Sequence, residues 1–235
     1  HNRRNNLKYD SQERIIYVAA SRIVIYNKEL NSQNFLNEMA NLDFGIDPEI
    51  SCFCLSKDRR LVCYGTSEIE CKVMLWDVCA YVLLASVTLK DCTQVLLVKL
   101  SSKSRYAAVV CLTNHYLQVL YLIEFREGNS QVVASALLSE NSSFKVKDIV
   151  IEETKGLQIV TCGVQHLMFW KLNSDKLEYY SAQLSADSED VKVAFLNCLQ
   201  VNEVLLTGGD DGKIYIWREE KLLKRVSGHE RCVLS

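Results

Sequence analysis

Short apolar segments, separated by polar turns, recur along the whole chain and determine the fold that we expect. The segments are rich in Val, Ile, Leu and aromatic residues, as is typical of β-strands, and no long stretch keeps a helical period. Five of them share one form, a strand that ends near an aromatic or bulky residue. These five segments are residues 22–26, 72–77, 117–121, 166–170 and 213–217. The pattern predicts an all-β protein.

The five segments are nearly evenly spaced. Taking Tyr26, Trp76, Leu120, Trp170 and Trp217 as their anchors, the intervals are 50, 44, 50 and 47 residues. A drifting period of this size indicates repeated four-stranded units. The predicted units cover approximately residues 5–39, 50–89, 93–138, 145–183 and 191–227, and residues 229–235 begin another.

A single four-stranded sheet has two apolar faces and cannot bury both of them alone. Radial stacking of such sheets in a β-propeller is the usual solution. We therefore expect residues 1–235 to form a partial WD40-type β-propeller, about five four-stranded blades plus the start of a sixth, from a truncated ring of seven. The alternative is a β-sandwich, which short strands also permit. Strands that end in Trp at one period favour the propeller.

The fifth unit carries the clearest motif. Its residues 208–212 read Gly-Gly-Asp-Asp-Gly between two apolar strands, and glycine and aspartate tolerate the positive φ that a tight hairpin needs. Thr207, Asp211 and Trp217 match three members of the WD40 hydrogen-bond network. His229, in a Gly-His pair, matches the fourth member and would open the sixth unit. Trp76 and Trp170 are the corresponding tryptophans of the second and fourth units.

Composition narrows the function classes. The chain has 27 basic and 29 acidic side chains without a basic block, which argues against non-specific binding of nucleic acid. Its apolar stretches are far shorter than a membrane helix, and its first residues match neither a secretion signal nor a lipidation motif. Most of its ten cysteines lie in apolar segments, where a thiol behaves as a small hydrophobic group. We expect a cytoplasmic protein with reduced cysteines.

Three clusters were weighed as possible sites. Cys52 and Cys54 lie on one face of a strand, but no second pair supplies metal ligands, so core packing is favoured. Asp210 and Asp211 could form a carboxylate pair, yet the turn and the Trp network explain both. The acidic segment 187–190 is a solvated loop or a contact for a basic partner. His166 is interpreted as a structural histidine at a strand end. We predict no catalytic, cofactor-binding or metal-binding residues.

Three segments resemble a particular family. They are residues 4–7 (Arg-Asn-Asn-Leu), followed by 14–27; residues 160–170, with Thr-Cys-Gly and then His-Leu-Met-Phe-Trp; and residues 206–217. All are similar to the first propeller of the echinoderm microtubule-associated protein-like family. There an Arg-Asn-Asn segment closes the HELP motif. The Gly-Tyr-Arg-Gly part of that motif is absent here, and residues 66–71 are short and acidic where the family has a long loop. With one proline and nine glycines, the turns should rely on Asn, Asp and Ser.

The resemblance implies a non-catalytic scaffold that binds tubulin or a microtubule-linked partner at the cytoskeleton, without membrane or nucleic acid, in a protein that continues into a second propeller. The first alternative is a scaffold of a ciliary or flagellar complex that does not bind tubulin directly. A propeller hydrolase is the remaining alternative. It would need carboxylates or histidines clustered at the strands that line the central channel, and the sequence shows none.

Overall fold

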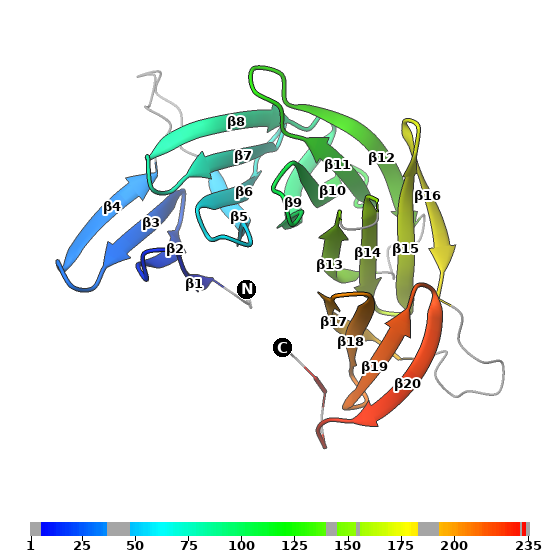
Figure 1. Ribbon diagram of the computed structural model, residues 1–235. Helices are drawn as coiled ribbons and strands as arrows, with labels where there is room; N and C mark the ends of the chain where they lie inside the picture. The colour runs from blue at the N-terminus through cyan, green and yellow to red at the C-terminus, as the bar shows by residue number, and fades with distance from the viewer. Residues whose placement is uncertain are drawn as a thin grey trace. The chain divides into compact units, whose positions relative to one another are not determined.

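All of the regular structure that is described in this chain is β-strand. The computed structural model describes residues 6–36, 48–139, 145–153, 156–182, 193–230 and 232–233. Within these ranges the strands form five four-stranded antiparallel sheets, and no helix occurs (Figure 1). The predicted all-β fold and its four-stranded units are confirmed.

The chain divides into two compact units, one of 1–115 with 122–132 and the other of 116–121 with 133–235. The first sheet comprises β1 (Leu7–Tyr9), β2 (Ile15–Ala19), β3 (Arg22–Asn27) and β4 (Ser32–Leu36). The second comprises β5 (Glu49–Leu55), β6 (Leu61–Ser67), β7 (Lys72–Asp77) and β8 (Val82–Thr88), and the third comprises β9 (Cys92–Leu100), β10 (Tyr106–Thr113), β11 (Gln118–Glu124) and β12 (Gln131–Ser139). The fourth and fifth sheets comprise β13 (Val146–Glu152), β14 (Gln158–Gly163), β15 (His166–Asn173) and β16 (Lys176–Ser181), then β17 (Phe195–Val201), β18 (Val204–Gly209), β19 (Lys213–Arg218) and β20 (Lys221–Ser227).

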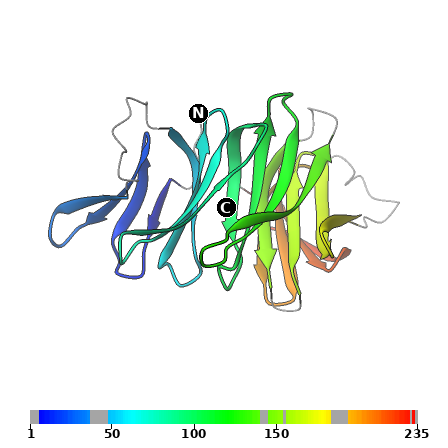
Figure 2. The same ribbon diagram turned by 90° about the horizontal axis from the view of Figure 1, so that it is seen from above.

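The four strands of each sheet pair in chain order, so we label them a, b, c and d. Because neighbouring strands are antiparallel, the a–b and c–d loops of a sheet open at one end and the b–c loop opens at the other. Figure 2 shows the strands of the second and third sheets (cyan to green) running side by side, with their hairpins at opposite ends of the view. This connectivity decides which loops can act together.

The second sheet and β9 pack closely within the first unit. The Ser51 hydroxyl, at the start of β5, donates to the Val95 carbonyl of β9 over 2.6 Å. Near the other end of β5, the Cys54 thiol lies within hydrogen-bonding reach of the Leu100 main chain. A Cβ on Gly65 would lie only 2.4 Å from Val95 Cβ, so only glycine permits this approach. The two a strands therefore run in the same direction.

Each unit has its own apolar core. In the first unit, Ile16, Ile23 and Ile25 of the first sheet pack with Val62 and Trp76 of the second. In the second unit an aromatic group holds the fifth sheet together. There Phe195 meets the rings of Tyr215 and Trp217 edge to face, at centroid distances of 5.2 and 5.9 Å. In both units, side chains from two successive sheets share one core, as stacked sheets require.

The turns differ from the expectation. We expected Asn, Asp and Ser to replace glycine, and this is wrong in part. The non-glycine residues with positive φ are Glu13, Ala20, Asn31, Arg59, Glu70, Tyr81, Asp91, Ser104, Tyr116, Gln165, Ser174, Asn202 and Glu219. Most of these are neither Asn, Asp nor Ser. Such residues pay a steric cost in this region, which the hydrogen bonds of the flanking strands must outweigh.

Some strand limits also differ from those predicted. The c strand of the third sheet, whose segment was predicted at 117–121, is β11 at Gln118–Glu124. In the fifth unit, predicted to begin at residue 191, the a strand is β17 at Phe195–Val201; residues 191–192 lie outside the described residues. Residues 229–235 were predicted to begin another unit, but Cys232 and Val233 are not in a strand. Val233 N nevertheless donates to Gly209 O over 3.0 Å. The start of a sixth unit stays a prediction.

Candidate protein-binding surface

Two of the three tryptophans are tied to a threonine on the neighbouring b strand. Trp217 Nε1 donates to Thr207 Oγ1 over 2.9 Å, and Trp170 Nε1 donates to Thr161 Oγ1 over 2.8 Å. Both threonines are completely buried. The structure thus brings together Thr207 and Trp217 of the proposed network, and it places an equivalent pair in the fourth sheet. The bond from Trp170 to Thr161 was not predicted, although Thr161 lies nine residues before its Trp and Thr207 lies ten before its own.

Trp76 breaks this pattern. Its Nε1 is buried and has no hydrogen-bond partner among the described residues. The register explains the difference. Trp217 lies opposite Leu205, two residues before Thr207, whereas Trp76 lies opposite Val62, two residues before Tyr64. The second sheet therefore offers a bulky ring where the fifth offers a hydroxyl.

His166 completes the polar group of the fourth sheet. Its Nε2 lies 2.7 Å from Thr161 Oγ1, and its side chain is only 2% exposed. Burial lowers the pKa of His166 to about 4, because the charged imidazolium loses its hydration. Its Nδ1 has no partner among the described residues. This neutral, buried ring agrees with the structural role that we expected for it.

Asp211 and His229 form hydrogen bonds with residues other than Thr207 and Trp217. Asp211 Oδ1 accepts from Lys213 N at 3.1 Å, and Oδ2 accepts from the Tyr215 hydroxyl at 2.8 Å. Burial alone would raise the pKa of Asp211, but these donors outweigh it and lower the pKa. His229 is exposed, and its main-chain N donates to Gly212 O over 3.0 Å. Asp210 Oδ1 accepts from Ala194 N at 3.0 Å, so both aspartates act within the turn region.

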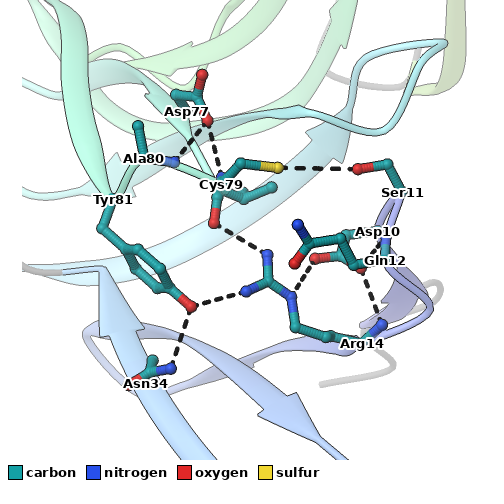
Figure 3. Close-up of polar contacts among 10 residues, drawn as sticks. Asp10, Ser11, Gln12, Arg14, Asn34, Asp77, Cys79, Ala80 and Tyr81 are labelled. Carbon is teal, nitrogen blue, oxygen red and sulfur yellow. Dashed lines mark hydrogen bonds and ion pairs between the residues drawn. The ribbon is translucent and has the colours of Figure 1, made fainter.

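A buried arginine joins the first two sheets (Figure 3). Arg14 Nε donates to Asp10 Oδ2 over 2.7 Å, and its other two nitrogens donate to the Tyr81 hydroxyl at 2.7 Å and the Val78 carbonyl at 3.1 Å. Asn34 Nδ2 donates to the same Tyr81 hydroxyl. Asp10 is 1% exposed and Arg14 is 9% exposed, so this ion pair is removed from solvent. We call these residues the Arg14 clamp.

Asp10 and Arg14 of the clamp belong to a turn that is repeated in the first three sheets. The a–b loops begin at Asp10, Ser56 and Ser101. In each loop a side-chain oxygen of this first residue accepts from a main-chain N–H at the loop's end, namely that of Arg14, Leu61 or Tyr106. The residue three positions on has positive φ, and an arginine follows it: Arg14, Arg60 and Arg105. The starts of the three turns are 46 and 45 residues apart, a repeat that the sequence analysis missed.

Similar bonds fix the c–d loops. Asp77 Oδ1 accepts from Cys79 N and Ala80 N at 2.8 and 2.9 Å, and Asn27 Oδ1 accepts from Glu29 N and Leu30 N. The a–b loops of the first two sheets also touch, because Ser11 N donates to Arg59 O over 3.3 Å. Since β5 and β9 run in the same direction, the a–b loop of the third sheet opens at the same end. These loops form one face of the first unit, which we call the a–b/c–d face.

Seven of the ten cysteines are buried, whereas Cys52 and Cys79 are partly buried and Cys232 is exposed. All ten are free thiols, and Cys54 lies directly opposite Cys63 in the second sheet. Burial raises the pKa of Cys63, and it raises the pKa of Cys52 to about 12, so both thiols are protonated at neutral pH.

Over the described ranges, no three His, Cys, Asp or Glu side chains are grouped to hold a metal ion. Also in those ranges, no helix has the length and hydropathy needed to cross a membrane. The acidic segment 187–190 and residues 4–5 lie outside the described residues.

Comparisons with known proteins identify the fold. No family model matches the chain. It is similar to Cilia- and flagella-associated protein 251 of Pongo abelii, with 34% identity over 71 residues, which are 30% of this chain and 6% of that protein. Among solved structures it is similar to a chain of the Mitotic Checkpoint Complex, at TM-score 0.65 and 15% identity, covering 97% of this chain and 64% of the other. It also matches the Cps50 (Swd1) β-propeller domain of Myceliophteria thermophila, at TM-score 0.62 and 12% identity, covering 83% and 62%.

These matches, together with the five antiparallel sheets, confirm a WD40-type β-propeller fold. The chain spans less than two thirds of each of these proteins. The β-sandwich alternative is excluded by the same likeness.

The tryptophan hydrogen bonds predict different costs for one substitution. Trp217→Phe removes the N–H that donates to the buried Thr207 hydroxyl, whereas Trp76→Phe removes an N–H that has no partner in the described part of the chain. We expect Trp217→Phe to lower the free energy of unfolding by about 1 kcal/mol more than Trp76→Phe does. Urea denaturation of both variants measures this. Equal losses would contradict the assignment, because the change in ring volume is the same.

The Arg14 clamp predicts a large loss of stability on Arg14→Gln. Asp10 would keep its main-chain donors but lose its cation while buried, and we expect a cost of about 3 kcal/mol. Arg22→Gln is the matched control, because Arg22 is exposed and lies 6.0 Å from the Phe35 ring centroid. We expect it to cost less than about 1 kcal/mol. Adding Asp10→Asn to Arg14→Gln should recover part of the loss in thermal denaturation, and no recovery would count against a buried ion pair.

His166 predicts a pH dependence of stability. The pKa is about 6.5 in the unfolded chain and about 4 in the folded one, so between these values the unfolded state binds the extra proton. Stability therefore falls as the pH drops from about 6.5 to about 4, by roughly 3 kcal/mol from this residue. We expect His166→Gln to show a shallower decline over that interval in denaturation curves. Parallel curves for the two proteins would refute the assignment.

Proposed function

We propose that this chain is a non-catalytic scaffold that binds protein partners through its loops, in a ciliary or flagellar complex. The observation that carries the proposal is the a–b/c–d face. Its loops are held by hydrogen bonds from Asp10, Asn27, Ser56, Asp77 and Ser101 to main-chain N–H groups. A loop that is ordered before binding loses little conformational entropy when a partner docks.

The loops present side chains that suit contact with a protein. Leu30, in the c–d loop of the first sheet, is 75% exposed, although the Asn27 side chain holds its main chain in place. In the second sheet, Lys57, Arg59 and Arg60 are exposed on a loop that is closed by Ser56. Apolar and basic side chains on a fixed frame support a binding function, since function in propellers lies in the loops and not in the strands.

The ciliary context is supported by the similarity to Cilia- and flagella-associated protein 251. Because the match covers 6% of that protein, it supports the context and not a specific partner. A protein of such a complex lies in the cytoplasm, at the cytoskeleton of the axoneme. Continuation of the chain into further blades and a second propeller belongs to the same proposal.

Direct binding of tubulin is the second candidate. It is favoured by the resemblance of residues 4–7, 14–27, 160–170 and 206–217 to the microtubule-associated family. In the structure, 160–170 form the strands that contain the Thr161, His166 and Trp170 hydrogen bonds. Those side chains are buried, so the resemblance in that segment concerns the interior of a blade. It does not identify which loops would bind tubulin.

Affinity purification from ciliated cells separates these candidates. With the tagged chain as bait, we expect enrichment of axonemal proteins over a control in which Leu30, Lys57 and Arg59 are replaced by Ser, Gln and Gln. Co-sedimentation with purified tubulin is measured in parallel. Axonemal enrichment without co-sedimentation supports the first candidate, and co-sedimentation supports the second. Equal recovery with bait and control would refute binding through the a–b/c–d face.

A further inference from the structure

Two exposed arginines on the a–b/c–d face share one buried carboxylate. Arg105 donates to Glu124 Oε1 from Nε at 2.9 Å and from one terminal nitrogen at 2.6 Å. Arg126 reaches the other oxygen, Oε2, at 2.8 Å. Both arginine side chains are 55% exposed, whereas Glu124 is 4% exposed. The two guanidinium groups are therefore held by Glu124 on their buried side and are accessible to solvent on the other.

This arrangement leaves a net positive charge at a defined position. Burial alone would raise the pKa of Glu124, but the hydrogen bonds from Arg105 and Arg126 outweigh it and lower the pKa, so the carboxylate is ionised. One negative charge thus faces two positive ones. Arg105 is also stacked 5.2 Å above the Tyr106 ring, and the Ser130 hydroxyl bonds the main chain of Arg126. Both side chains have lost freedom that an isolated surface arginine would keep.

The neighbouring loops extend the positive charge. The loops 56–60, 77–81, 101–105 and 125–130 carry the basic residues Lys57, Arg59, Arg60, Lys103, Arg105 and Arg126, all of which are exposed. Their acidic residues are mostly engaged in their own turns. Asp58 accepts from Ser56 Oγ and Arg60 N, and Asp77 accepts from two main-chain N–H groups. The remaining carboxylate on these loops, Glu127, is exposed.

A structural role for the two arginines would not require this exposure. Arg14 is an example of an arginine that holds two sheets of this protein together, since it is 9% exposed and forms hydrogen bonds from one sheet to the next. Arg105 and Arg126 instead bond within the third sheet and remain half exposed. Fixed guanidinium pairs of this kind bind planar oxyanions with charge-assisted hydrogen bonds.

We propose that Arg105 and Arg126 form the centre of a docking site for an acidic segment of a protein partner, whose carboxylates bind the two guanidinium groups. The exposed Lys57, Arg59 and Arg60 attract the flanks of the same segment. This inference rests on the proposed scaffold function and specifies the chemistry of its partner. Association is steered by charge and weakens as salt screens it.

The test is a direct binding measurement on the full chain. A fluorescein-labelled oligoglutamate peptide is titrated with the protein, and an oligoglutamine peptide of the same length is the control probe. We expect binding of oligoglutamate alone, weakened by added NaCl. The double variant Arg105→Gln/Arg126→Gln should bind about tenfold more weakly or worse. Arg22→Gln, an exposed arginine outside these loops, should bind as the unmodified protein does.

Folding of the variants is checked by their thermal denaturation. If the double variant fails to fold, the single variants Arg126→Gln and Arg126→Lys are compared in the same binding measurement. Lys keeps the charge and should retain more binding than Gln. Absence of oligoglutamate binding by the unmodified chain would overturn the proposal, and so would an equal loss in Arg22→Gln. If the chain recovers axonemal partners equally with and without the double substitution, the docking site is wrong while the scaffold function stands. If it recovers none yet binds oligoglutamate through these arginines, the scaffold function is wrong and the site stands.

Discussion

Each sheet of this protein has two apolar faces, and the need to bury both of them governs the rest of the structure. Ile16 and Ile25 of the first sheet share a core with Trp76 of the second, and Phe195 of the fifth shares one with Phe169 of the fourth. The sheets must approach closely for this to succeed. At Gly65 a single added carbon would collide with Val95. Burial of apolar surface thus fixes how strands of successive sheets lie, and the loops follow from the strands.

Close stacking leaves polar groups to be satisfied inside. Trp170 and Trp217 donate hydrogen bonds to threonine hydroxyls. Arg14 donates to the Asp10 carboxylate, a main-chain carbonyl and a tyrosine hydroxyl. Each of these contacts joins strands that the apolar core has already brought together. They add little net attraction, but each would be costly to leave unmade, and so they select one arrangement. Trp76 shows the limit of the rule, because its buried N–H has no partner among the described residues, where the register places Tyr64 and not a threonine.

The sequence predicted the periodic part of this structure better than the particular contacts. Strands were recognisable because apolar periodicity is local, and Thr207 with Trp217 could be matched to a known motif. The Arg14 clamp could not be predicted, since Arg14 and Tyr81 are 67 residues apart and meet only when two sheets pack. The turns were also misjudged. Residues such as Tyr81 and Glu219 adopt positive φ because the flanking strands impose it, against their own preference.

The repeated a–b turn shows how one local structure can serve two purposes. Arg14, Arg60 and Arg105 hold the same place in it, after a residue with positive φ. In the first sheet the carboxylate is inside the turn, at Asp10, so the arginine folds inward and becomes a buried link to the next sheet. In the third sheet Ser101 takes that position and the carboxylate lies on β11, at Glu124, so Arg105 is drawn along the surface toward Arg126. The location of one acidic side chain therefore decides whether this arginine contributes to cohesion or is presented to a partner.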